Sequence, residues 1–261
     1  MSNAPGSGAA LTAASLERAV RAAGILAPVR FEEVTDSTNA RALALAEDGA
    51  PEWTIVAAGH QTAGRGRLGR TWLDDAGRSL LFSLVLRPEL SPTLAGLLSL
   101  LAGAAVADAC RDVAAVEAGC KWPNDVLVRD RKLAGILAEA SVAEGRLRHL
   151  VLGVGVNLAP PPVGLTGATG LEGADAAGLL GSFLSGFREA YRPREPGFAA
   201  DVVRRHRERS VTIGRRVRAQ TVSGEVVEGD AVGIDDRGGL LVATDGGVAV
   251  VGFGEVLHLD A

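Results

Sequence analysis

A short segment of the chain concentrates arginine and glycine. Residues Gly64–Trp72 read GRGRLGRTW, and three arginines, Arg65, Arg67 and Arg70, lie within six residues. Glycine lets a backbone approach a ligand closely and leaves its N–H groups free to face it. Arginine carries a permanent charge and a planar donor fork that suits carboxylate or phosphate. The segment therefore predicts a loop that binds an anion and becomes ordered with it, and an exposed, solvated turn is the alternative.

The same loop matches the dinucleotide pattern G-x-G-x-x-G at residues 64–69. That fingerprint requires a helix directly after the loop, with its N-terminus under the pyrophosphate. Here a glycine-containing turn leads instead to an apolar run at residues 79–86, which is typical of a strand. The sequence therefore argues against a Rossmann site.

Lys121 and Lys132 are the two lysines of the chain. Lys121 opens the turn KWPND, in which Pro123 has a fixed φ and biases Trp122 toward an extended conformation. Such a turn holds Lys121 and Asn124 in set directions, and a fixed ammonium can bridge a carboxylate and a phosphate. A surface turn with Trp122 in the core, and a solvated Lys132, are the alternatives.

Glycines also mark two of the expected strands. Gly153 and Gly155 lie at alternate positions of one strand, which would clear one face for a flat ligand. Gly135 follows Lys132 within a strand, where glycine indicates close approach of a backbone or ligand. Asn157, at a strand end, could bind phosphate or a metal-bound water. Tight packing within the sheet is the alternative for the glycines.

Small polar residues occupy one strand-to-helix junction. Ser37, Thr38 and Asn39 follow a strand expected over 29–34 and precede a helix expected over 39–47. Their side chains can cap the helix or form hydrogen bonds with a neutral polar ring. Capping alone is sufficient to explain them.

The elements that must position these residues follow from periodicity, glycine and proline. Because many connections between strands are short, the pairing should be largely antiparallel. We expect an α+β fold, with a mixed, largely antiparallel sheet and helices on one face. The predicted helices cover 12–23, 39–47, 92–110, 174–191 and 197–209, and the predicted strands cover 29–34, 53–58, 79–86, 125–128, 133–141 and 149–157, with a loop over 160–170.

The pattern changes near residue 212. Short alternating segments separated by glycine or Asp-Gly turns follow to the end, and they predict a small all-β barrel. The expected organisation is a flexible tail over 1–10, a main domain over 11–211 and a barrel over 212–261.

Composition narrows the class of protein. The 261 residues are 47% apolar and 22% charged, as in soluble globular proteins, and the net charge of -4 disfavours a nucleic-acid binder. Two cysteines without paired spacing indicate a reducing compartment, and four scattered histidines give no support for a zinc site. The longest apolar run, about 94–107, is short for a membrane span, and the N-terminus has no signal-peptide pattern. We expect a cytoplasmic protein without membrane contact.

Five motifs occur in one order between about residues 30 and 160: DSTN, QTAGRGRLGRTW, KWPND, KLAGIL and GVGVN. Together they closely resemble the motif series of the biotin protein ligase family, and the segment ending GFGEVLHL resembles that family's C-terminal SH3-like domain. The resemblance implies a class II aminoacyl-tRNA synthetase/biotin ligase-like fold. It also implies ATP-dependent activation of biotin to biotinyl-5'-AMP, with Mg²⁺, and transfer to a lysine of a biotin carboxyl carrier domain of a carboxylase.

The resemblance also implies roles for individual residues. Lys121 and Arg67 would be catalytic, and Trp72 would pack over the ligand or anchor the loop. Biotin contacts are expected at Ser37, Thr38, Asn39, Gln61, Gly64, Arg65, Gly66, Arg67, Trp72, Lys121, Gly153 and Gly155. ATP contacts are expected at Arg67, Arg70, Asn124, Lys132 and Asn157, and no protein-held metal site is expected.

Three alternatives can be weighed against this resemblance. A lipoate or octanoate ligase of the same fold would show a different Arg/Gly-Gly signature near the first loop. A biotin sensor without activity would not need Lys121 and three loop arginines. A DNA-binding regulator is disfavoured by the charge, and about 28 residues before the first strand are too few for a helix-turn-helix domain. We expect a monomer or weak homodimer without repressor function.

Overall fold

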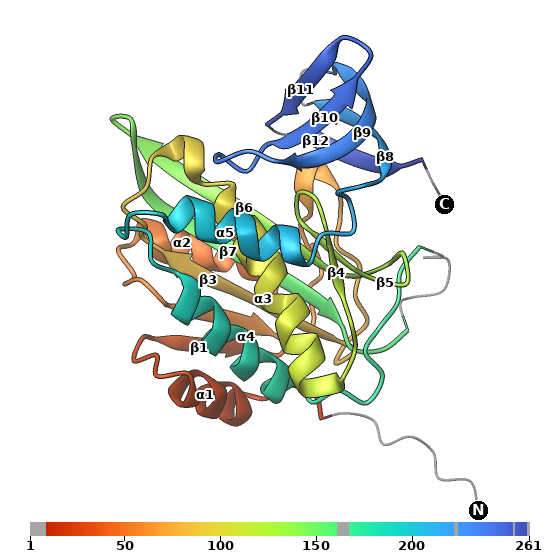
Figure 1. The fold of residues 1–261 in the computed structure, drawn as a ribbon. Helices are drawn as coiled ribbons and strands as arrows, with labels where there is room; N and C mark the ends of the chain where they lie inside the picture. The colour runs from red at the N-terminus through yellow and green to blue at the C-terminus, as the bar shows by residue number, and fades with distance from the viewer. Residues whose placement is uncertain (1–8, 161–166, 222–223, 253, 260–261) are drawn as a thin grey trace, which may run out of the picture.

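The computed structural model describes residues 9–160, 167–221, 224–252 and 254–259. Within these ranges, seven strands form a mixed sheet, and five further strands form a separate antiparallel sheet near the C-terminus (Figure 1). The large sheet has the order β1-β2-β3-β7-β6-β5-β4. Its strands are β1 (Val29–Glu32), β2 (Ile55–Ala58), β3 (Ser79–Leu86), β4 (Gly119–Lys121), β5 (Asp125–Val128), β6 (Arg131–Ala143) and β7 (Arg146–Asn157).

The pairing of the large sheet is largely antiparallel, as the short connections predicted. β1 and β2 pair in parallel, and the pairs β2–β3, β3–β7, β7–β6, β6–β5 and β5–β4 are antiparallel. The mixed α+β architecture is therefore confirmed. β4 was not predicted, because three residues are too few to show a strand period.

The five predicted helices are present, each with boundaries close to those expected. A hydroxyl or carboxylate side chain caps α1, α2 and α4 at Thr12, Ser37 and Asp175. The helices are α1 (Ala13–Ala22), α2 (Thr38–Glu47), α3 (Leu97–Ala114), α4 (Ala176–Ala190) and α5 (Phe198–Glu208), with short 3-10 turns at Arg67–Gly69 and Pro92–Leu94.

Helix α3 accounts for the longest apolar run of the chain. It packs against α4, α5 and the sheet. The stretch Pro92–Ala114 is long and apolar enough to cross a membrane by length and composition, yet 67% of its most apolar window is buried inside the protein. Burial in the core therefore explains its apolar character, as the sequence predicted.

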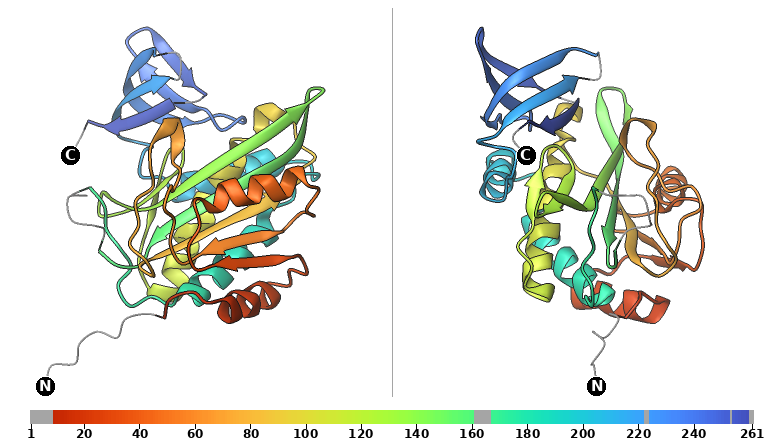
Figure 2. Two further views of the ribbon diagram at one scale, coloured as in Figure 1. Left: turned by 180° about the vertical axis from the view of Figure 1, so that it is seen from behind. Right: turned by 90° about the vertical axis from the view of Figure 1, so that its right-hand side faces the viewer.

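Helices cover both faces of the large sheet, so the prediction of helices on one face is wrong (Figure 2). α1, α3 and α4 share one core with the residues of one sheet face. α2 packs on the opposite face, against Val56, Val85 and Val151. The physical reason is that β2 and β3 are apolar and buried on both faces, so each face needs a cover.

The C-terminal strands form the small all-β unit that the alternating segments predicted. They are β8 (Arg216–Thr221), β9 (Val226–Ile234), β10 (Leu240–Thr244), β11 (Gly247–Val251) and β12 (Gly254–His258), in the order β11-β10-β9-β8-β12. Trp122 joins this unit to the large sheet, because its Nε1 donates to Gly238 O at 2.8 Å and its backbone N to Thr212 Oγ1 at 3.1 Å. Residues 1–8 of the tail predicted over 1–10, and residues 161–166 of the loop predicted over 160–170, lie outside the described residues.

Candidate active site

A cavity of about 190 Å³ lies on the sheet face that α2 covers, between the Gly/Arg loop and the ends of β4, β5 and β12. Helix α2 packs on this face, whereas α1, α3 and α4 pack on the opposite one (Figure 2). The sequence-predicted residues that line the cavity are Ser37, Thr38, Asn39, Gln61, Arg65, Gly66, Arg67, Arg70, Trp72, Lys121, Asn124, Lys132, Gly153 and Gly155.

The Gly/Arg loop, Gly64–Trp72, folds back on itself as a small hairpin. Gly66 N donates to Arg70 O at 2.7 Å, and Trp72 N donates to Gly64 O at 2.9 Å. A Cβ at Gly64 would lie 2.5 Å from Trp72 O, so glycine permits the close approach of the two arms. Strand β3 follows this loop, so the helix that a dinucleotide fingerprint requires is missing there, in agreement with the sequence argument.

One end of the cavity, which we call the neutral end, consists of Ser37, Thr38, Asn39, Gln61 and Ser83. Thr38 donates to Gln61 Oε1 from its backbone N at 2.7 Å and from its Oγ1 at 3.1 Å. Ser83 Oγ, on β3, lies 2.9 Å from Thr38 Oγ1. Ser37 caps α2 and also lines the cavity, so capping and a place in the site occur together.

Asn39 is the most constrained side chain of the neutral end and is 4% exposed. Its Oδ1 accepts from Ser83 Oγ at 2.6 Å, and its Nδ2 donates to Leu137 O at 3.3 Å and to Glu139 Oε2 at 2.8 Å. A Cβ at Gly153 would lie 2.0 Å from Asn39 Oδ1. We expected a flat ligand over Gly153. In the structure, the side chain of Asn39 fills this space.

Trp72 lies over two glycines that face each other across strands β6 and β7. Gly135 and Gly155 are register partners, and a Cβ at either would lie 3.0 Å or 2.8 Å from the indole ring. Lys132 Nζ is 5.8 Å from the ring centroid, a cation–π distance. The indole of Trp72, at the end of the Gly/Arg loop, therefore packs against Gly135 and Gly155 of the sheet.

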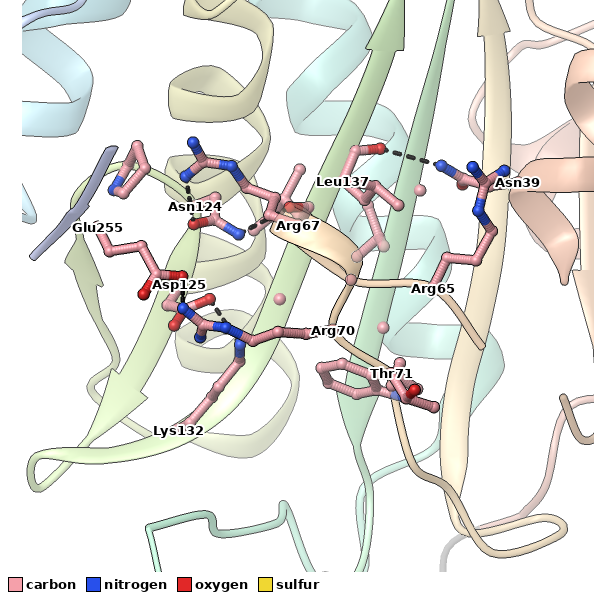
Figure 3. Close-up of a pocket in the computed structure, with 18 of the residues that line it drawn as sticks. Asn39, Arg65, Arg67, Arg70, Thr71, Asn124, Asp125, Lys132, Leu137 and Glu255 are labelled. Atoms are coloured by element: carbon pink, nitrogen blue, oxygen red, sulfur yellow. Dashed lines mark hydrogen bonds and ion pairs between the residues drawn. The ribbon is translucent and has the colours of Figure 1, made fainter. Parts of the chain in front are cut away.

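The other end, which we call the charged end, consists of Arg67, Arg70, Lys121, Asn124, Asp125, Lys132 and Glu255 (Figure 3). Arg67 Nη1 donates to Asn124 Oδ1 at 3.1 Å and to Gly254 O at 3.3 Å. Arg70 forms an ion pair with Glu255, and Lys132 Nζ lies 2.7 Å from Asp125 Oδ1. The C-terminal unit thus reaches the Gly/Arg loop through β12.

Lys121 differs from the other cations of the charged end. Within the described residues, no hydrogen bond or ion pair engages its ammonium. Burial lowers the pKa of Lys121 from its ordinary value, and the carboxylate of Asp125 acts in the opposite direction. Burial likewise lowers the pKa of Arg67. A partly desolvated, unpaired ammonium interacts strongly with an incoming anion.

Two of the predicted site residues do not line the cavity. Gly64 lies in the loop's own hairpin, and Asn157 donates from Nδ2 to Thr169 O at 3.0 Å, which secures the segment after β7. The structure also brings to the site residues that the sequence did not single out: Ser83, Asp125, Glu139, Gly254 and Glu255. Asp125 belongs to the KWPND motif, but nothing in the sequence connects Arg67 to a backbone 187 positions away.

The fold and the site together define a class of protein. A cavity with a hydrogen-bonding neutral end and a cation-rich charged end fits a small organic acid and a phosphate-bearing co-substrate. The α+β sheet carries most of the cavity, and the C-terminal β unit reaches it. This is the arrangement of a catalytic domain and a C-terminal domain that the motifs predict for a ligase.

Comparisons with known proteins give the family. The model of the "Biotin/lipoate A/B protein ligase family" matches residues 31–157, and that of the "Biotin protein ligase C terminal domain" matches residues 212–259. The chain belongs to the biotin protein ligase family.

Individual relatives agree with this membership. The biotin--[acetyl-CoA-carboxylase] ligase of Mycobacterium tuberculosis is 43% identical over 239 residues, 86% of each chain. The bifunctional ligase/repressor BirA of Bacillus subtilis is 35% identical over 84% of this chain and 70% of that protein. The structure of the biotin protein ligase from Aquifex aeolicus in complex with biotin and ATP has a TM-score of 0.73 and 26% identity, and the match covers 88% of this chain and 99% of that one.

Proposed function

We propose that this protein is a biotin–[biotin carboxyl carrier protein] ligase. It activates biotin with ATP to biotinyl-5'-AMP and transfers the biotinyl group to a lysine of an acceptor protein. Membership of the family and the names of its relatives support this function. The observation that carries it is one cavity with a neutral end for a polar ring and an unpaired Lys121 at the charged end.

We infer that the neutral end holds the ring of biotin. The ring carries a cyclic urea with two N–H donors and one carbonyl acceptor, which requires neutral donors and acceptors. Ser37 offers its hydroxyl and Gln61 offers the Nε2 of its amide, and both residues line the cavity beside Thr38. Because hydrogen bonds within the protein already hold these groups in place, binding costs little additional ordering.

We infer that the charged end serves both chemical steps. The carboxylate oxygen of biotin attacks the α-phosphorus of ATP, the bond to the β-phosphate oxygen breaks, and pyrophosphate leaves. The ammonium of Lys121 and the guanidinium of Arg67 neutralise the growing negative charge around phosphorus. The acceptor's amine then attacks the mixed anhydride carbonyl, an amide forms, and AMP leaves. Arg70, Asn124 and Lys132 would contact the nucleotide, and the Gly/Arg loop would shield the adenylate from water.

Mg²⁺ belongs to this proposal through its chemistry with ATP. Among the residues that the structure describes, no group of three or more His, Cys, Asp or Glu side chains is arranged to hold a metal ion. The carboxylates that line the cavity, Asp125 and Glu255, are each paired with a cation. Mg²⁺ commonly keeps most of its waters and binds through nucleotide phosphates. We therefore propose that it enters with ATP and neutralises phosphate charge there.

The acceptors we propose are biotin carboxyl carrier domains of carboxylases, in keeping with the relatives' names. A cytoplasmic location remains part of the proposal because the two cysteines lack paired spacing, and the lack of a nucleic-acid partner because the net charge is -4. A monomeric or weakly dimeric state is also proposed.

Biotin-dependent exchange of pyrophosphate into ATP tests the activation step. The purified protein should catalyse exchange with biotin and ATP–Mg²⁺, and it should show none with lipoate or octanoate. A lysine-bearing carrier domain should then gain one biotinyl group, measured as a mass increase. Exchange supported by lipoate in place of biotin would contradict the proposal and favour a lipoate ligase of the same fold.

A further inference from the structure

Glu139 on β6 touches two site residues at once, although it lies outside the cavity lining. Its Oε1 lies 2.9 Å from Arg65 Nη2, and its Oε2 accepts from Asn39 Nδ2 at 2.8 Å. One carboxylate thus joins the Gly/Arg loop to the floor of the neutral end. The side chain of Arg65 extends toward Asn39, on the side of the cavity away from Arg67 and Arg70 (Figure 3).

Strand alternation explains why Glu139 reaches both partners. Gly135, Leu137 and Glu139 are alternate residues of β6 and therefore point to the same face, the face of the cavity. The side chain of Glu139 is 23% exposed, against 47% for Arg65. This partly buried carboxylate is stabilised by its two charged or polar partners, so each partner is held in return.

The contacts of Asn39 clarify what Glu139 supports. Both polar atoms of the Asn39 amide are used by protein groups: Oδ1 by Ser83 and Nδ2 by Glu139 and Leu137 O. Asn39 therefore contributes to the neutral end by its shape and by its fixed position over Gly153. Glu139 and Leu137 O together fix which way the amide faces, because Nδ2 is a donor and both of its partners are acceptors, and Glu139 makes the shorter contact.

We propose that Glu139 is a positioning residue for biotin, which rests on the function proposed above. It holds Arg65, and with it the first arm of the Gly/Arg loop, against the neutral end, and it fixes the Asn39 amide beneath the ring. Its contribution is to biotin binding and to retention of the adenylate. It has no part at the charged end, because its contacts lie with Arg65 and Asn39 alone among the site residues.

The variant Glu139→Gln tests this assignment, with Glu144→Gln at the exposed β6–β7 turn as the matched control. Pyrophosphate exchange in Glu139→Gln should show a KM for biotin about tenfold higher, the loss of one charge-assisted contact, with the KM for ATP within about twofold. Purified biotinyl-5'-AMP should dissociate several-fold faster. Glu144→Gln should match the unmodified protein in all three measurements.

A double-mutant cycle separates positioning from a general structural effect. Arg65→Gln should raise the KM for biotin, and adding Glu139→Gln should raise it further by clearly less than tenfold, because the contact with Arg65 is already lost and only the contact with Asn39 remains to be removed. Equal rises in both KM values, additive effects, or a lower KM for biotin in Glu139→Gln would overturn the assignment. The last outcome would mean that Glu139 competes with the substrate's carboxylate for Arg65. Absence of biotin-dependent exchange in the unmodified protein would instead refute the proposed function itself.

Discussion

The neutral and charged ends of the cavity are built on different principles. At the neutral end, hydrogen bonds join Thr38 to Gln61 and Asn39 to Ser83, and so connect α2 with the segment after β2 and with β3. At the charged end, the cations come from the Gly/Arg loop, the end of β4 and the start of β6, and one carboxylate comes from β12. The polar groups of the neutral end are held by the protein itself without a ligand. The charged end brings several cations close together.

This difference indicates how recognition and chemistry are divided. A neutral ring is bound best by groups that are already oriented, because buried polar groups need fixed partners. An anion that gains charge during a reaction is stabilised best by cations that are not already neutralised. The neutral end should therefore control the affinity for biotin, and the charged end should control the rate of adenylation.

The largest effect should come from the unpaired cation. Lys121→Ala should lower the rate of pyrophosphate exchange by about 10³-fold, because a removed charge-stabilising donor typically costs about 10²–10³. Biotin binding in the absence of ATP should change far less, as measured by calorimetry. A thermal unfolding midpoint near that of the unmodified protein serves as the control for folding. Near-normal exchange would remove Lys121 from the mechanism and abolish the contrast between the two ends.

The next effect concerns the glycine beneath Asn39. Gly153→Ala places a Cβ 2.0 Å from Asn39 Oδ1, so the amide must leave its position. We expect a KM for biotin about 10²-fold higher and a loss of about 2 kcal/mol in the free energy of unfolding, as for overpacking of a core. Denaturant titration and exchange kinetics would measure the two.

Gly155→Ala provides a matched comparison on the same strand. Its Cβ would lie 2.8 Å from the indole of Trp72, which belongs to the loop and can shift with it. We expect a smaller loss of stability than for Gly153→Ala. Equal losses of stability in the two variants would show that Trp72 is held as rigidly as Asn39, which would contradict this prediction.

A smaller effect is expected where the C-terminal unit meets the loop. Arg70→Ala removes the ion pair with Glu255 and one cation of the charged end. We expect the KM for ATP to rise about tenfold, the value of one charged contact, with the KM for biotin nearly unchanged. Both partners are well exposed, so the free energy of unfolding should change by less than about 1 kcal/mol. Arg78→Ala, outside the cavity, is the control. A selective rise in the KM for biotin in Arg70→Ala would contradict the assignment of biotin binding to the neutral end and nucleotide binding to the charged end.

The smallest effect is a dependence on pH. Lys121 must carry its proton to act, and burial lowers its pKa, so the active form is lost as the pH rises through this lowered value. Adenylation should therefore decline a few-fold at an alkaline pH where an ordinary lysine is still charged. Binding of biotinol, which has no carboxylate, should stay constant over the same range, because the side chains of the neutral end do not titrate.

A charge-retaining variant checks the origin of this decline. In Lys121→Arg the residual exchange should be independent of pH over that range, because a guanidinium keeps its proton. The same decline in Lys121→Arg as in the unmodified protein would assign it to another group.

The sequence by itself determined the elements and most of the site. Periodicity located the five helices and the small β unit, because a side chain's partners within a helix or strand lie a few residues away. The motifs, through the family that they resemble, named Lys121, Arg67 and the residues of the neutral end other than Ser83. Glycine, proline and charge at short spacing by themselves indicated only the Gly/Arg loop and the turn that holds Lys121. A strand of three residues, β4, carried too little pattern to be found.

Only the tertiary structure decided which residues meet. It assigned α2 to the face opposite the other core helices and filled the space over Gly153 with Asn39. It brought Glu139 to Arg65 and Glu255 to Arg70 across long stretches of chain. These contacts depend on strand order and on the docking of the C-terminal unit, and both result from the burial of apolar faces that many distant residues share.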